Sequence, residues 1–99
     1  MSPDRVLAHL RESAHEVREA VVIDSSGRRL AGSRTLAGPA GDLLRQAGEA
    51  VEVEVGTGRG TVFAVHGEHA AIAVVAQRSA LSSVMRYDLR MAADEVNPS

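Results

Sequence analysis

The glycine-rich stretch from Gly56 to Gly60 is the first segment whose residue types could hold a phosphate. A phosphate-binding loop ends in Gly-Lys-Ser or Gly-Lys-Thr and opens a helix, because backbone N–H groups and the helix dipole then meet the phosphate oxygens. This stretch has no lysine, and the strand formers Thr61, Val62 and Phe63 follow it. It therefore predicts the turn of a β-hairpin.

Two histidines, His66 and His69, have the spacing of metal ligands across a turn, and Glu68 lies between them. Two neutral imidazoles without a cysteine or a firm third ligand make a weak zinc site. We therefore expect a solvent-exposed turn there, with no metal and no cofactor. His9 and His15 fall on the solvent-facing side of a predicted helix, and no nucleophile is near either of them in sequence.

Residues for acid–base or nucleophilic catalysis are equally sparse. Glu52 and Glu54 project to the same face of a predicted exposed strand, where nothing obvious raises a carboxylate pKa. No serine lies on a Gly-x-Ser-x-Gly elbow, and the chain has no cysteine. We therefore expect no enzyme, but a protein that acts by binding other proteins.

The composition narrows the class of partner. The 99 residues make one domain, 1–99, with a net charge of −2 and two aromatic residues. Nucleic-acid binding needs a basic face or rings for stacking, so we expect no nucleic-acid partner. The longest nearly unbroken apolar run, Ala70 to Ala76, is too short to span a bilayer, and the first residues open no apolar run. We expect no membrane insertion, no signal peptide and a cytoplasmic protein.

Helical periodicity predicts three helices. The first begins at Ser2-Pro3-Asp4, a capping hydroxyl followed by a proline and an acid, and its apolar spacing runs to Val17. The second is firm over 39–47, and the third begins at Ser79 and ends at Asn97-Pro98. The apolar stripe of the second helix contains Leu36, Ala40, Leu43, Leu44 and Ala47. The stripe of the third contains Leu81, Val84, Met85, Leu89, Ala92 and Val96, with Tyr87 and Met91 on its flank as core, rim or contact residues.

Five strands are predicted between these helices. An Asp24–Gly27 turn joins strand 20–23 to strand 28–33, and strands 51–55, 61–66 and 70–76 follow. Strands 20–23 and 70–76 are apolar on both faces, so helices must cover both sides of the sheet. The fold class is therefore α/β (α+β). It is a three-layer sandwich with a five-stranded antiparallel sheet, in the order α-β-β-α-β-β-β-α.

Strand 51–55 alternates strictly, which places three valines on one face and two glutamates on the other. Its half-polar character predicts an edge of the sheet. An edge strand exposes unpaired N–H and C=O groups and can extend the sheet into a partner. The two glutamates are equally consistent with a device that prevents such pairing, and the residues leave both interpretations open.

The segment from Ala20 to Ser33 resembles the opening hairpin of the roadblock / dynein light chain family. In that hairpin a strand closes on an Asp/Gly turn and a second strand ends in small residues, as in Ile23-Asp24-Ser25-Ser26-Gly27 and Ala31-Gly32-Ser33. The similarity continues through the Leu43-Leu44 helix, the later strands and the closing helix, and so covers nearly the whole chain. Profilin-like and longin domains share a similar sheet.

The resemblance implies a cytoplasmic homodimer that regulates or scaffolds a Ras-like small GTPase. The third strands would pair across a two-fold axis, with the middle helices, 39–47, packed alongside. The positions carried over to the dimer interface are Val51, Glu52, Val53, Glu54, Val55, Leu43, Leu44 and Ala47. Leu36, Arg34 and Arg45 are the GTPase-facing positions. All eleven Lys or Arg residues are arginine, a composition that suits an actinobacterium. Actinobacterial domains of this family are commonly encoded beside a small GTPase and a histidine-kinase-like sensor protein. The resemblance therefore implies such a sensor protein as a further partner.

One feature departs from a simple homodimer. If two copies pair antiparallel about Val53, then Glu52 opposes Glu54 of the partner, and like charges directly opposite are destabilising. Arg45 or Arg59 are the candidates for neutralising them, and a different register or a more basic partner chain are the alternatives. Two other functions also stay open: an assembly scaffold without a GTPase partner, and a small-molecule sensory domain, for which the small aliphatic core predicts no enclosed pocket.

Overall fold

The structure is a computed structural model that describes residues 1–48 and 51–96. Its helices and strands follow one another in the predicted order, which confirms the predicted fold class. The elements are α1 (Pro3–Ser13), β1 (Val17–Ile23), β2 (Arg29–Gly32), α2 (Arg34–Gln46), β3 (Glu52–Thr57), β4 (Gly60–His66), β5 (Ala71–Ala76) and α3 (Ser82–Glu95).

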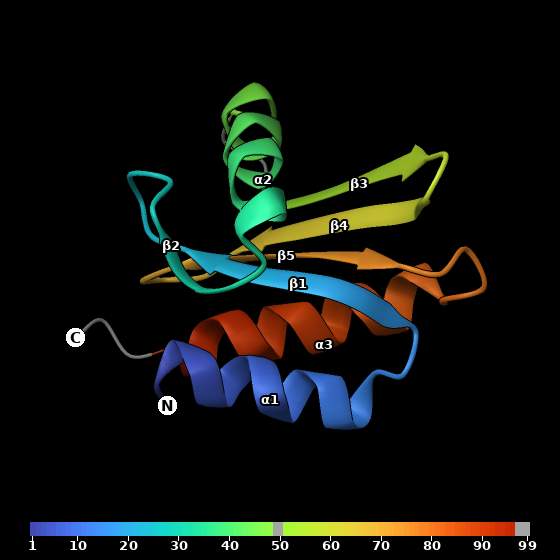
Figure 1. Ribbon diagram of the computed structural model, residues 1–99, viewed down its shortest axis with the longest axis horizontal. Helices are drawn as coiled ribbons and strands as arrows, with labels where there is room; N and C mark the ends of the chain where they lie inside the picture. Colours follow the sequence, from blue (N-terminus) through green and yellow to red (C-terminus); the bar gives the residue numbers. More distant parts are fainter. Residues whose placement is uncertain (49–50, 97–99) are drawn as a thin grey trace.

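The five strands form one antiparallel sheet in the order β2-β1-β5-β4-β3. The helices α1 and α3 lie side by side on one face, and α2 lies alone on the other (Figure 1). In this view α2 stands over the left half of the sheet, and the β3–β4 hairpin extends to the right of it. Strand β3 is the last in the strand order and is therefore an edge strand, as its half-polar sequence predicts.

The alternation of side chains along β1 and β5 divides the core in two. One cluster lies between the sheet and the α1–α3 layer, and it contains the largest buried side chains, including Phe63, Ile72 and Leu89. The other lies under α2 and combines small residues, such as Ala40 of α2 and Ala73 of β5, with Leu36 and Leu44 of α2. It contains fewer large side chains than the first cluster, so α2 is held on the sheet mainly by these two leucines.

The first helix is shorter than predicted. It ends at Ser13, and residues 15–16 form a turn, so His15 is not helical. Val17 fits the helical spacing, yet it belongs to β1, where it pairs with Ala76 of β5. Pairing with a distant strand suits a β-branched residue better than another helical turn does, and no local stop signal marks the change.

The second helix is longer than predicted and includes Pro39 in its interior. It begins at Arg34 because the Ser33 hydroxyl accepts a hydrogen bond from the Leu36 N–H, 3.2 Å away. The Ser33 and Thr35 hydroxyls also donate to the Glu19 carboxylate of β1. These bonds anchor the capping residue Ser33 to β1, and so determine where α2 begins.

The third helix starts later than predicted. Ser79 is not its cap: the helix begins at Ser82, and the N-cap residue, Leu81, makes no side-chain capping bond. The predicted end at Asn97-Pro98 lies outside the described residues. Leu81 and Val84, expected in the buried stripe, are exposed, whereas Met85, Leu89, Ala92 and Val96 are buried as predicted.

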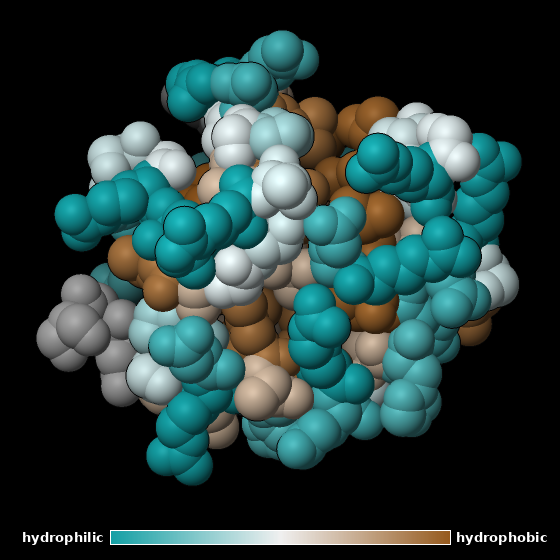
Figure 2. Space-filling model, viewed as in Figure 1, coloured by the Kyte–Doolittle hydropathy of each residue, from teal (hydrophilic) through white to brown (hydrophobic). Residues whose placement is uncertain are grey.

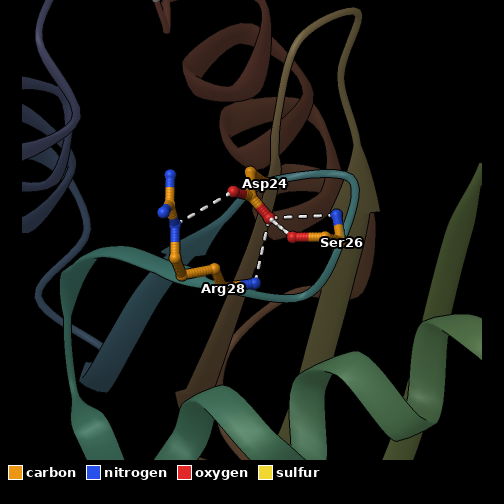
Figure 3. A network of polar contacts seen from close by, with 3 residues as sticks. All are labelled: Asp24, Ser26 and Arg28. Carbon is orange, nitrogen blue, oxygen red and sulfur yellow. Dashed lines mark hydrogen bonds and ion pairs between the residues drawn. The ribbon is translucent and has the colours of Figure 1, made fainter.

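A network of polar contacts around Asp24 closes the β1–β2 hairpin (Figure 3). Its Oδ1 accepts hydrogen bonds from the Ser26 hydroxyl, the Ser26 N–H and the Arg28 N–H, and its Oδ2 lies 3.4 Å from Arg28 Nε. The Ser26 hydroxyl bond is the main reason that the pKa of Asp24 lies below its ordinary value of 3.8, and the Arg28 N–H lowers this pKa further. The Asp-Ser-Ser-Gly turn predicted from the sequence is confirmed.

We predict that Gly32→Ala destabilises the protein by about 3 kcal/mol, because both conformation and space forbid a side chain there. Gly32 has φ +92°, and a Cβ would lie 2.3 Å from the Ala20 carbonyl oxygen. The matched control is Gly38→Ala in α2, where a Cβ meets nothing within 4 Å. Urea unfolding at one fixed protein concentration compares the two, and the control should gain about 0.5–1 kcal/mol. Equal stability of both variants would contradict this account of Gly32.

We also predict that Asp24→Asn lowers stability at neutral pH and that the difference from the wild type shrinks on acidification. Because folding lowers the pKa of Asp24, its ionised form stabilises the fold above pH 3.8, and this stabilisation disappears as the pH falls through the lowered value. Thermal unfolding between pH 7 and pH 2 measures the effect. Asp42→Asn, which removes an exposed ion pair with Arg45, serves as the control and should change little.

Candidate functional site

The outer edge of β3 carries backbone groups without a strand partner. The His66 N–H donates to the Val51 carbonyl at 2.8 Å, so Val51 faces His66 as a hydrogen-bonded pair at the start of the β3–β4 ladder. Hydrogen-bonded pairs alternate along an antiparallel ladder, and therefore the odd-numbered residues of β3 bond to β4. The N–H and C=O groups of Glu52, Glu54 and Gly56 point the other way, away from the sheet.

The valine face of β3 lies on the α2 side of the sheet. Val53 packs with Val62 and Leu43 against the edge of the smaller core cluster, but Val55 is 38% exposed and Val51 is 55% exposed. Figure 2 shows hydrophobic surface between α2 and the β3–β4 hairpin. Helix α2 therefore covers only part of its face of the sheet, and the uncovered part borders the free edge.

The glutamate face of β3 lies against α3. Glu52 Oε1 forms an ion pair with Arg90, and the Ser82 hydroxyl donates to Glu54 Oε2 at 2.8 Å. Glu52 is partly buried, and its Oε2 has no hydrogen-bond partner among the described residues. The predicted exposure of this strand face therefore does not hold for Glu52, whose side chain is 21% exposed. Arg45 and Arg59 do not form its ion pair: Arg45 pairs with Asp42 on α2.

Sequence patterns do not identify Arg90 as the partner of Glu52. Arg90 is one of eleven arginines, and nothing in its neighbourhood along the chain distinguishes it from the others. The contact depends on where α3 packs against the sheet, and this placement follows from the buried core between them, which local sequence patterns do not encode.

The other predicted interface residues lie on α2. Leu43 and Ala47 are partly buried, and Leu44 is fully buried in the smaller core cluster. Among the predicted GTPase-facing residues, Arg34 and Arg45 are exposed near the two ends of α2, whereas Leu36 is buried. Leu36 and Leu44 thus hold the helix on the sheet, while Leu43 borders the uncovered valines.

The glycine-rich stretch forms the predicted hairpin turn. Thr57 and Gly60 pair at the end of β3 and β4, and the Thr57 hydroxyl accepts a hydrogen bond from the Arg59 N–H. Arg78 donates to the Thr57 carbonyl at 2.7 Å, and Arg18 donates to the Arg59 carbonyl at 3.3 Å. The turn's polar groups are therefore largely engaged within the protein.

The two candidate metal ligands lie at the other end of β4. His66 ends β4, and His69 lies in the following turn; both are exposed. No cluster of three metal-ligating side chains occurs in the part of the chain that the structure describes. The two residues border an open hollow of about 350 Å³ between the β1–β2 turn, the end of α2 and the β4–β5 turn. Asp24 also borders this hollow, but its oxygens are already bonded within the turn.

A second apolar surface lies on α3, away from β3. Tyr87 and Met91 are 61% and 49% exposed, and together with His9 and Ser13 of α1 they line a shallow groove between the two helices. The groove has a volume of about 170 Å³. It is too small for most ligands, which occupy sites of about 300 Å³ or more.

Comparison with known proteins gives matches among solved structures alone. No protein-family model matches the chain. No curated protein matches it either. Two structures of a Roadblock/LC7 domain from Streptomyces avermitilis are similar to it. One has a TM-score of 0.76 at 24% identity over 94% of this chain and 96% of that one. The other has a TM-score of 0.80 at 21% identity over 99% and 97%.

The chain is also similar to the gliding protein MglB from Thermus thermophilus. That match has a TM-score of 0.65 at 22% identity, over 91% of this chain and 82% of that one. A structure of MglB in a tetrameric arrangement matches with a TM-score of 0.64 at 22% identity, over 91% and 83%. The predicted resemblance is confirmed in the fold: this chain has the fold of Roadblock/LC7 domains. Among the described residues, no helix combines the length and apolar character needed to cross a bilayer.

Proposed function

From the Roadblock/LC7 fold, we propose that this protein is a non-enzymatic, cytoplasmic homodimer that regulates or scaffolds a Ras-like small GTPase. The observation that carries the proposal is the combination on β3 of a free edge and an uncovered apolar face. An edge alone can be protected by charge, and an apolar face alone can be covered by a loop. Because the free edge and the uncovered valine face belong to the same strand, they favour a partner that supplies both a strand and an apolar surface.

A second copy of the chain supplies both. In a two-fold dimer the same patch meets itself, so each β3 gives the other its missing backbone partners. The pairing also brings the partner's α2 flank, with Leu43 and Ala47, toward the uncovered valines. The structure of MglB in a tetrameric arrangement supports self-association for this fold.

The pair of α2 helices then forms the surface for the GTPase. Arg34 and Arg45 are its exposed charged residues, and Leu36 supports the helix from below. The dimer would favour one nucleotide state of the GTPase by binding it more tightly than the other, because a ligand shifts an equilibrium only through differential affinity. Arg45 is engaged by Asp42 on an exposed helix surface, which suits a docking contact better than a catalytic arginine.

The test uses the purified protein and a Ras-like small GTPase from the same genome, loaded with GDP or with a non-hydrolysable GTP analogue. We expect binding that differs between the two states, measured by titration calorimetry. The double variant Arg34→Ala/Arg45→Ala should weaken it by about tenfold. Arg11→Ala removes the same kind of charge from α1, on the opposite face of the sheet, and should leave the affinity unchanged.

Light scattering of the protein alone separates the two parts of the proposal. A dimer that binds the GTPase in neither nucleotide state would contradict the GTPase part and leave an assembly scaffold. A monomer at all concentrations would contradict the homodimer. An equal loss of affinity in the Arg11 variant would contradict the assignment of the α2 surface.

A further inference from the structure

We propose that the two β3 strands pair antiparallel with Val53 on the two-fold axis. In this register, Arg90 of each protomer supplies the positive charge between its own Glu52 and the partner's Glu54. The inference rests on the homodimer proposed above and specifies how its strands meet. In this arrangement, Arg90 from α3 offsets the repulsion between Glu52 and the partner's Glu54 that the sequence predicts.

The free edge permits few registers. Only the backbone groups of Glu52, Glu54 and Gly56 point outward, so a new ladder must join even-numbered residues of both copies. An antiparallel two-fold pairing within this short edge can then be centred on residue 53, 54 or 55. These three registers differ in what lies opposite each side chain.

The valine face distinguishes between them. With Val53 on the axis, it faces its own copy, and the two exposed valines of this face, Val51 and Val55, face each other across the seam. The row is then valine against valine along its whole length. Centring on residue 54 leaves Val51 opposite Thr57, and centring on residue 55 leaves it opposite Arg59 in the hairpin turn. The first register therefore covers the most exposed apolar surface.

The same register places Glu52 opposite the partner's Glu54 on the other face. Here the intramolecular contacts matter, because Arg90 already pairs with Glu52 and Ser82 already holds Glu54 toward α3. The Arg90 side chain is 54% exposed, so part of its guanidinium remains accessible beside the seam. A planar guanidinium has enough N–H donors for two carboxylates, and it offsets their mutual repulsion.

The register centred on residue 54 has no such compensation. It sets Glu54 directly opposite its own copy, while Arg90 stays with Glu52 opposite Gly56. The register centred on residue 55 avoids facing glutamates but loses most of the valine contacts. The structure thus favours the one pairing in which both faces of β3 are satisfied.

Single-cysteine variants test the register, because the natural chain has no cysteine. Val53→Cys, Glu54→Cys and Val55→Cys are each oxidised with glutathione disulfide at a concentration where light scattering shows a dimer. A disulfide needs Cα atoms within about 7 Å of each other, which only a residue on the axis reaches. We expect the Val53 variant to form the covalent dimer first on a non-reducing gel.

Each outcome decides the inference. Faster cross-linking of the Glu54 or Val55 variant would overturn the register, and so would a dimer in which no variant cross-links. A wild-type protein that is monomeric by light scattering would instead contradict the homodimer itself. The two failures are therefore distinguishable.

Arg90→Ala tests the charge contact, with Arg11→Ala as the control for loss of one positive charge. We expect Arg90→Ala to raise the dimer dissociation constant by about tenfold in low salt, because the contact occurs twice in a symmetric dimer. In high salt, the dissociation constants of this variant and of the wild type should lie closer together, because salt screens the charges. In a Glu52→Gln/Glu54→Gln background, which lacks both carboxylates of the contact, the same substitution should have little effect. Circular dichroism shows whether each variant is folded. An unchanged dissociation constant in folded Arg90→Ala, or an equal loss of affinity in the Glu52→Gln/Glu54→Gln background, would overturn the role of Arg90.

Discussion

Strand β1 pairs with β5 along nearly its whole length, although β2, α2, β3 and β4 lie between them in the chain. This pairing joins the two strands that are buried on both faces, and the other elements take their places from it. It makes the sheet's order β2-β1-β5-β4-β3, so β3 must lie at an edge. It also sets α1 and α3 together on one face and leaves α2 alone on the other, where it covers only part of the sheet.

Local sequence patterns predicted the class, order and turns of this fold because these depend on short-range chemistry. The Asp24 turn and the strict alternation of β3 are examples, since each is set by residues only a few positions apart. The element boundaries that were wrong depend on distant contacts. Val17 becomes a strand residue by pairing with Ala76, and α2 begins early because Glu19 of β1 accepts hydrogen bonds from its cap.

The candidate site shows the same division. The sequence placed the three valines and two glutamates of β3 on opposite faces, and it identified the strand as an edge. It could not say which layer each face meets, and it offered Arg45 or Arg59 as candidates for neutralising Glu52 and the partner's Glu54. The observed partner, Arg90, comes from α3. An ion pair between elements far apart in the chain follows from tertiary packing, and a single sequence carries no local sign of it.

The tight turn between β3 and β4 has a consequence for the life of the chain before it is folded. A hairpin with so short a connection closes early, whereas β1 must wait for β5 to leave the ribosome. Both strands of this hairpin leave the ribosome before α3, which carries Arg90. Until α3 packs against the sheet, Glu52 has no Arg90 to pair with, and facing glutamates on two unfinished chains oppose pairing edge to edge. In the proposed homodimer, α3 would therefore have to be in place before two chains pair through β3.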